Sequence, residues 1–173
     1  MQRVVLRYGL IAGTVLALLL VLTFVLLPEP DFENGQLYGY TGMVVAFLMV
    51  FFGIRAYRDQ QPGPLSFGRA FRVGALITGV ATLCYVATWE VIYWKFAPDF
   101  ADKYAAYALE KARKGGASDA ELAKTKRELD DFKVMYDNPL YNAAITFLEP
   151  LPVGLVMTLV AASMLRTKEG AGG

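Results

Sequence analysis

The sequence of 173 residues contains no histidine and only one cysteine. Without histidine, the chain has no Ser-His-Asp or Cys-His catalytic centre, no histidine-ligated haem and none of the common zinc and di-iron sites. Cys84 has no second cysteine with which to form a disulfide within the chain. These absences lead us to expect a protein that is not an enzyme, with no metal site and no cofactor.

The sequence also lacks a large excess of charge of either sign. Its net charge is +1 at pH 7, and no basic strip carries interleaved aromatic residues, so nucleic acid is not an expected partner. Apolar residues are abundant instead, at 55% of the chain. Because this share is well above that of a soluble domain, and because the charges are segregated, we expect one membrane domain over residues 1–173.

Four apolar runs are long enough to cross a bilayer as helices. They cover about residues 4–27, 37–54, 69–96 and 140–165. The first run is longer than the apolar core of a signal peptide and is not followed by a small-residue cleavage pattern, so we interpret it as an uncleaved helix. The sequence therefore predicts an all-α membrane protein with four transmembrane helices.

The bases at the ends of these runs predict the orientation. Arg3 and Arg7, the loop from Arg55 to Arg72, and Arg166 with Lys168 fall on one side of a four-helix arrangement, whereas the turn at residues 28–36 has acids and no base. By the positive-inside rule, both termini are cytoplasmic. The bases in residues 98–138 oppose this assignment, but they are matched by acids and most lie away from the span ends.

Contacts with membrane lipids are expected at both ends of the spans. Basic side chains at the cytoplasmic end are suited to anionic headgroups, and aromatic side chains at the other end are typical of an interfacial belt. The basic residues are Arg55, Arg58, Arg69 and Arg72, and the belt residues are Trp89, Tyr93, Trp94 and Phe96.

The polar segment at residues 98–138 has the pattern of two helices. Aromatic residues recur at helical spacing after Pro98, Gly115-Gly116 interrupts the pattern, and Ser118-Asp-Ala-Glu121 is a capping box. A second apolar stripe follows and ends at Asn138-Pro139. We expect an extracytoplasmic α-hairpin that closes the bundle. A protein partner docked on this hairpin is the alternative role.

Spans one and three share a short pattern that is consistent with a 2+2 duplication. Each begins with an arginine followed two residues later by a glycine, and each has a second glycine after Leu-Ile-small, with one gap needed to align them. Coincidence between apolar helices remains the alternative. The glycines are Gly9 and Gly13 in the first span and Gly74 and Gly79 in the third, and we expect them to allow close helix packing. A homo-dimer through Gly9 and Gly13 is the alternative use.

Two carboxylates, Glu90 and Glu149, lie within spans, about 9 Å and 13 Å from the same end at 1.5 Å per residue. A charge in the bilayer usually faces a partner or a cavity, so we hypothesise a polar site in which Thr88 and Asn142 join the two carboxylates. Alternatively, Glu90 lies at the interface and Glu149 stabilises a helix break. Pro150 and Pro152 predict a kink beside Glu149.

Several short motifs resemble one known family. Leu65-Ser-Phe-Gly-Arg-Ala-Phe71 leading into Gly74, then Pro98-Asp-Phe100, then a capped acidic hairpin are similar to the bacterial membrane proteins catalogued as domain of unknown function 4199. The resemblance extends from Tyr8 to Ala162. It implies a four-span inner-membrane protein of Gram-negative bacteria, with no assigned activity and no catalytic residues.

Together these features favour a non-enzymatic structural or interaction component of the inner membrane. The alternative is a small proton-coupled transporter, or a carrier of lipophilic ligands, that uses Glu90 and Glu149.

Overall fold

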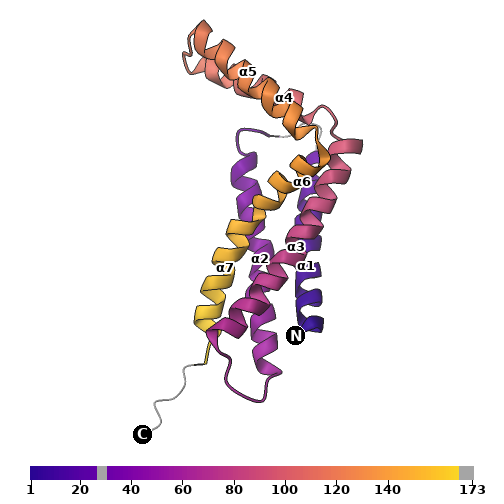
Figure 1. The fold of residues 1–173 in the computed structure, drawn as a ribbon, viewed down its shortest axis with the longest axis vertical. Helices are drawn as coiled ribbons and strands as arrows, with labels where there is room; N and C mark the ends of the chain where they lie inside the picture. Colours follow the sequence, from indigo (N-terminus) through magenta and orange to yellow (C-terminus); the bar gives the residue numbers. More distant parts are fainter. Residues whose placement is uncertain (27–30, 168–173) are drawn as a thin grey trace.

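The computed structural model describes residues 1–26 and 31–167, and it is helical throughout, with no strand in those ranges (Figure 1). The expected end of the first span at Leu27, part of the following turn, Lys168 and the tail lie outside the described residues. Four helical segments are long and apolar enough to span a membrane, as predicted for a multi-pass membrane protein. The four expected spans are therefore confirmed by length and composition.

The helices begin and end close to the expected positions. The first span is α1 (Gln2–Val21), continued by the π-helical turn η1 (Leu22–Leu26), and the second is α2 (Gly35–Asp59). The third is α3 (Phe67–Lys95). The fourth is divided into α6 (Pro139–Leu148) and α7 (Pro150–Leu165), with α4 (Phe100–Lys114) and α5 (Asp119–Tyr136) between the third and fourth spans.

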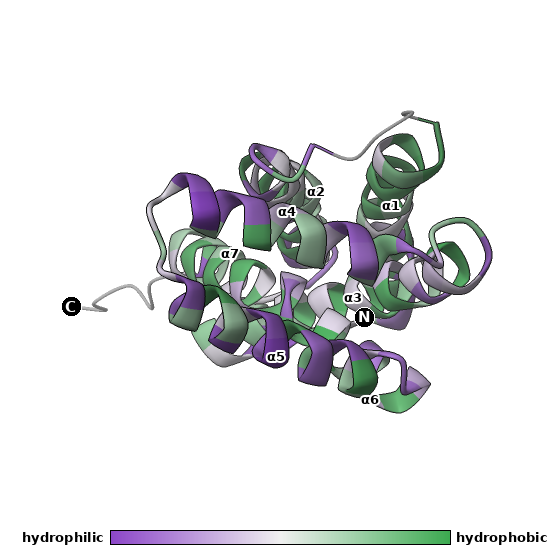
Figure 2. Ribbon diagram, turned by 90° about the horizontal axis from the view of Figure 1, so that it is seen from above, coloured by the Kyte–Doolittle hydropathy of each residue, from purple (hydrophilic) through white to green (hydrophobic). Residues whose placement is uncertain are grey.

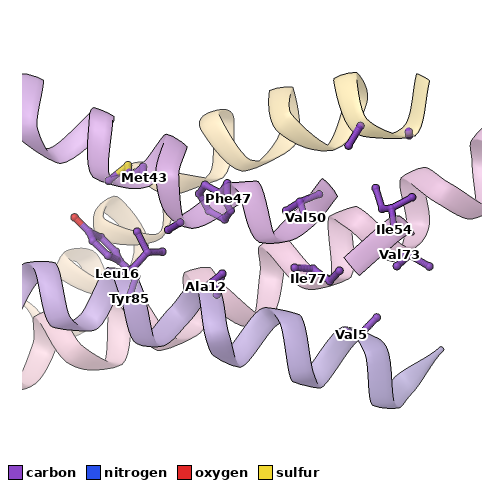
Figure 3. Close-up of a cluster of buried hydrophobic side chains, with 14 of the residues drawn as sticks. Val5, Ala12, Leu16, Met43, Phe47, Val50, Ile54, Val73, Ile77 and Tyr85 are labelled. Atoms are coloured by element: carbon purple, nitrogen blue, oxygen red, sulfur yellow. The ribbon is translucent and has the colours of Figure 1, made fainter. Parts of the chain in front are cut away.

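Helix α3 is the centre of the bundle, because it packs against α1, α2, α6 and α7. Its buried side chains meet those of α1 and α2 in one apolar core, which contains Leu16, Phe47 and Ile77 (Figure 3). Many apolar side chains on the opposite faces are exposed, including Leu18, Leu83 and Met164. Apolar residues on both faces are expected where the surrounding solvent is lipid.

Glycines bring the helix backbones together at two crossings, between α1 and α3 and between α3 and α7. A Cβ atom added at Gly9 would lie 2.7 Å from the Val80 side chain of α3. One added at Gly13 would lie 2.6 Å from the Cys84 side chain of the same helix. Gly74 is equally close to Thr158 of α7, at 2.7 Å. Gly79 differs, since an added Cβ there would meet nothing within 4 Å. The two glycine pairs that suggested a duplication are therefore not equivalent in packing.

Arginine side chains gather at one end of the bundle, here called the arginine end. The loop between α2 and α3 is tied there to the residues after α7, because the Thr167 backbone N–H donates to the Leu65 carbonyl and the Leu65 N–H donates to the Thr167 hydroxyl (2.9 and 3.1 Å). This clip joins two segments that are far apart in sequence. The residues that define the arginine end are Arg3, Arg7, Arg55, Arg58, Arg69, Arg72 and Arg166.

Helices α4 and α5 pack against each other at the opposite end, here called the helix-pair end (Figures 1 and 2). The chain turns between them at Gly115 and Gly116, and the φ of +86° at Gly116 suits glycine. Lys133 of α5 forms an ion pair with Asp102 of α4. Polar residues predominate on both helices in the view from above (Figure 2).

The predicted capping box at the start of α5 is confirmed. The Ser118 hydroxyl accepts a hydrogen bond from the Glu121 backbone N–H at 3.4 Å, and the Glu121 carboxylate accepts one from the Ser118 N–H at 2.8 Å. These bonds satisfy two N–H groups that a helix start otherwise leaves free.

We expect the first turn of α5 to open on acidification. The hydrogen bonds from the Ser118 backbone and hydroxyl lower the pKa of Glu121 below the ordinary 4.5 of a glutamate. A group whose pKa is lower in the folded state stabilises that state above its unfolded pKa and loses this contribution as the pH falls. Backbone hydrogen exchange at residues 119–122, corrected for intrinsic rates, should therefore show less protection at pH 3.5 than at pH 7. Glu121→Gln should remove this pH dependence, and an unchanged dependence in that variant would contradict the assignment.

Candidate functional site

The main polar feature of the bundle is a stripe on one face of α3, here called the α3 polar stripe. It contains Thr78, Thr82, Tyr85, Trp89 and Tyr93, whose spacings of three or four residues place them on one side of the helix. All five are buried, with exposed fractions between 0% and 8%. Polar atoms buried in this way are stable only with hydrogen-bond partners, so the partners show what the stripe does.

The stripe joins α3 to the chain that runs from α5 to α7. The Tyr93 hydroxyl donates to the Asp137 carboxylate at 2.7 Å, and the Trp89 indole N–H donates to the Tyr136 hydroxyl at 2.9 Å. Nearer the arginine end, the Tyr85 hydroxyl donates to Glu149 at 2.9 Å, and the hydroxyls of Thr78 and Thr158 lie 3.3 Å apart. Four members of the stripe therefore hold the fourth span and the end of α5 against α3.

Aromatic packing strengthens the attachment at the helix-pair end. The Trp89 ring meets Phe24 of η1 and Phe100 of α4 edge-on, with ring centroids 5.0 Å apart in both cases. Phe32, from the turn between α1 and α2, packs against Phe100, Tyr104 and Tyr107 of α4. The rings thus connect α4 to the first span through Phe24 and to the third span through Trp89.

The aromatic-belt prediction was wrong for two of its four residues. Trp94 and Phe96 are exposed, at 44% and 58%, as expected of side chains at a membrane interface. Trp89 and Tyr93 are buried, because their polar atoms bind Tyr136 and Asp137. Burial raises the pKa of Tyr136 above its ordinary value, and its hydroxyl accepts the hydrogen bond from Trp89.

The two predicted carboxylates have different partners. Glu90 accepts a hydrogen bond from the indole of Trp94 on its own helix at 2.9 Å, and its second carboxylate oxygen is buried without a partner in the described structure. Glu149 is exposed and binds Tyr85. In the ranges that the structure covers, no hydrogen bond joins Glu90 to Glu149.

The other residues of the predicted polar site are also separated. The Asn142 side chain is fully buried, donates to the Tyr136 carbonyl at 3.3 Å and accepts from the Thr146 hydroxyl at 3.3 Å. It therefore stabilises the corner between α5 and α6. Thr88 donates to the Cys84 carbonyl of its own helix at 2.8 Å. Such a bond satisfies the hydroxyl locally.

The fourth span changes direction at Glu149. Proline has no N–H, so Pro150 and Pro152 leave the carbonyls of Thr146 and Leu148 without their usual helical donors. Helix α6 ends at Leu148 and α7 begins at Pro150. Figure 1 shows α7 beside α2, whereas α6 leans toward α3. The break therefore separates α6 from α2 at the helix-pair end.

Comparison with known families found one matching family model. The family model described as protein of unknown function (DUF4199) matches residues 7–167, which is nearly the whole chain. The chain belongs to this family. The resemblance found in the sequence motifs is therefore confirmed, and the matched region covers most of the first span and the chain from α2 to α7. No curated protein and no solved structure matched the chain.

Sequence reasoning missed the α3 polar stripe as a unit. Its signal was present, since polar and aromatic residues recur every three or four positions from Thr78 to Tyr93. Each residue type is also common in lipid-facing or packing positions, so the spacing alone did not identify the partners. Tyr85 and Tyr136 became informative only when the fold placed them beside Glu149 and Trp89.

Proposed function

We propose that this protein is a non-enzymatic component of the bacterial inner membrane that holds an extracytoplasmic α-hairpin, formed by α4 and α5, in a fixed position for a protein partner. Its bundle serves as the platform, and both termini lie in the cytoplasm. The observation that carries the proposal is the attachment of α4 and α5 to α3 through Trp89, Tyr93 and the aromatic rings around them.

The charge distribution supports this orientation. The arginine end has many bases. Among the described residues there, the acid is Asp59, which forms an ion pair with Arg58 at 3.3 Å. Arg55, Arg69 and Arg72 are exposed and form no ion pair among the described residues. Guanidinium groups placed in this way suit anionic phosphate headgroups of the inner leaflet. In this proposal, lipid contacts at the arginine end fix the depth of the bundle.

The α4–α5 pair supports a role in interaction. Its charged side chains are exposed, with ion pairs such as Lys103–Asp99 and Lys114–Glu110, each 2.8 Å long. Surface pairs of this kind contribute little to stability, so the dense charge is available for solubility and recognition. A rigid attachment lowers the entropy cost that a mobile hairpin would have when it binds a partner.

Site-specific photo-crosslinking in living cells tests this function. A photoreactive amino acid at Lys126, on α5, should give a discrete cross-linked product, whereas the same residue at the lipid-facing position Leu83 should not. A Trp89→Phe, Tyr93→Phe double variant should reduce the Lys126 product, because it removes the two hydrogen bonds at the base of the pair. The mass of the product distinguishes another protein from a second copy of this chain. Equal products at both positions, or no effect of the double variant, would contradict the proposal.

A further inference from the structure

The bundle has an uncovered face on α2 near the helix-pair end. Phe47, Met43 and Tyr40 lie on one side of α2 at spacings of four and three residues. Phe47 is fully buried where α7 crosses it, since an added Cβ at Gly154 would lie 3.0 Å from its ring. Met43 is 6% exposed and Tyr40 is 49% exposed. This face of α2 is therefore covered at Phe47 and Met43 and exposed at Tyr40, on the side where the fourth span turns away toward α3.

Glu149 lies beside this uncovered face. Its side chain is exposed, and yet it reaches the hydroxyl of Tyr85, whose ring is only 8% exposed and belongs to the same buried cluster as Leu16 and Met43 (Figure 3). The Glu149 side chain therefore joins the bundle interior to the exposed surface. We call the place marked by Tyr40, Met43, Tyr85 and Glu149 the Glu149 site.

The Glu149 site lies deep within the fourth span. Glu149 is ten residues from the start of a span of 27 residues, Pro139–Leu165, so it lies about 15 Å along that span and about 5 Å from its midpoint at 1.5 Å per residue. A charged group at such a depth costs about 2.5–3.5 kcal/mol on insertion scales unless it has a partner. A carboxylate there calls for a cation or for several hydrogen-bond donors.

The described chain does not supply that cation. None of the described ion pairs contains Glu149, and its described hydrogen bond is the one from Tyr85. The Tyr85 hydroxyl is therefore the described partner of Glu149, and no described base neutralises the carboxylate.

We propose that the Glu149 site binds an amphiphile with a protonated amine head and an apolar chain. The ammonium group contacts the Glu149 carboxylate, and another of its N–H groups is available to the hydroxyl oxygen of Tyr85. The chain lies along the exposed apolar side chains on either side, Val44 of α2 and Leu148 of α6, which are 44% and 57% exposed. An amine is favoured over an alcohol because an ion pair is strong where water is excluded.

A photoreactive dodecylamine that carries a diazirine in its chain tests the proposal. The full-length protein in phosphatidylcholine nanodiscs should be labelled mainly at residues 40–44 and 148, and unlabelled dodecylamine should compete. Glu149→Gln keeps an oxygen for the Tyr85 bond but removes the charge, and it should lower the labelling at least tenfold. Glu90→Gln, the matched control, should leave the labelling unchanged.

Competition on the wild-type protein provides a test that is independent of folding in the variants. Dodecanol has the same chain without the charge, so it should compete at least tenfold less well than dodecylamine. Equal competition by the alcohol, equal labelling of the Glu149→Gln protein, or labels spread evenly over the lipid-facing surface would each overturn the proposal. These outcomes do not involve α4 and α5, so the amphiphile proposal and the proposed function fail or succeed separately.

Discussion

Replacing Gly154 with leucine is expected to destabilise the bundle by about 3 kcal/mol or more. Even a Cβ at this position would lie 2.3 Å from the Thr78 methyl group and 3.0 Å from the Phe47 ring. Both neighbours are fully buried and have little room to move. Overpacking of a dense core typically costs about 1–3 kcal/mol, and a leucine adds three carbons beyond the Cβ. Equilibrium unfolding of the purified protein in mixed micelles measures the loss.

Gly79→Leu is the matched control, since Gly79 lies on the same α3 that contributes Thr78. An added Cβ there would meet nothing within 4 Å, and leucine is the better helix former by somewhat less than 1 kcal/mol. We therefore expect unchanged or slightly higher stability. A similar loss in both variants would show that the α3–α7 crossing is not as close as described.

Replacing Trp89 with alanine is expected to release the α4–α5 pair and to cost about 3–5 kcal/mol, the usual cost of removing a large buried aromatic side chain. Trp89 is 5% exposed, packs on Phe24 and Phe100, and donates to Tyr136. Its loss leaves a cavity where η1, α3 and α4 meet. Thermal unfolding measures the cost, and limited proteolysis between α4 and α5 reports the release.

Trp94→Ala provides the comparison for the same residue type five residues further along α3. Trp94 is 44% exposed and donates to Glu90 on its own helix. We expect a loss of about 1 kcal/mol or less, with unchanged proteolysis of the α4–α5 pair. If Trp94→Ala loosened the pair as much as Trp89→Ala, the α3 polar stripe could not be what holds it.

The four spans were predictable because the membrane imposes a simple requirement on sequence. A helix must be apolar for about 20 residues to cross the bilayer, and the runs that end near Arg55 and Arg166 and the run that begins at Arg69 meet that requirement. The start of α5 was predictable for a local reason, since Ser118 and Glu121 satisfy each other within a single turn. Local and compositional signals of this kind need no knowledge of the fold.

The partners of the polar side chains were not predictable in the same way. Trp89 and Trp94 both lie near the same end of α3, and the sequence gives no sign that one binds Tyr136 while the other faces outward. Gly74 and Gly79 likewise occupy similar sequence contexts, although only Gly74 is packed against α7. These differences depend on which face of α3 meets the fourth span, and that is set by contacts between residues far apart in the chain.

In the region around Glu149, the helix break was predictable from the sequence and the hydrogen-bond partner was not. The prolines at positions 150 and 152 identified a place where the helix changes direction, as the break between α6 and α7 shows. The partner expected for Glu149 was Glu90, whereas the hydrogen bond in the structure comes from Tyr85. Carboxylates at similar depth on different helices meet only if both face the same side, and Glu90 lies off the α3 polar stripe.

Cysteine accessibility in intact cells tests the central claim, a four-span bundle with α4 and α5 outside and the arginine end inside. In a Cys84→Ser background, Lys126→Cys on α5 and Gly63→Cys in the exposed α2–α3 loop place one thiol at each end. A membrane-impermeant maleimide should label Lys126→Cys in intact cells and Gly63→Cys only after permeabilisation. Labelling of Gly63→Cys in intact cells, or protection of Lys126→Cys until permeabilisation, would contradict the account.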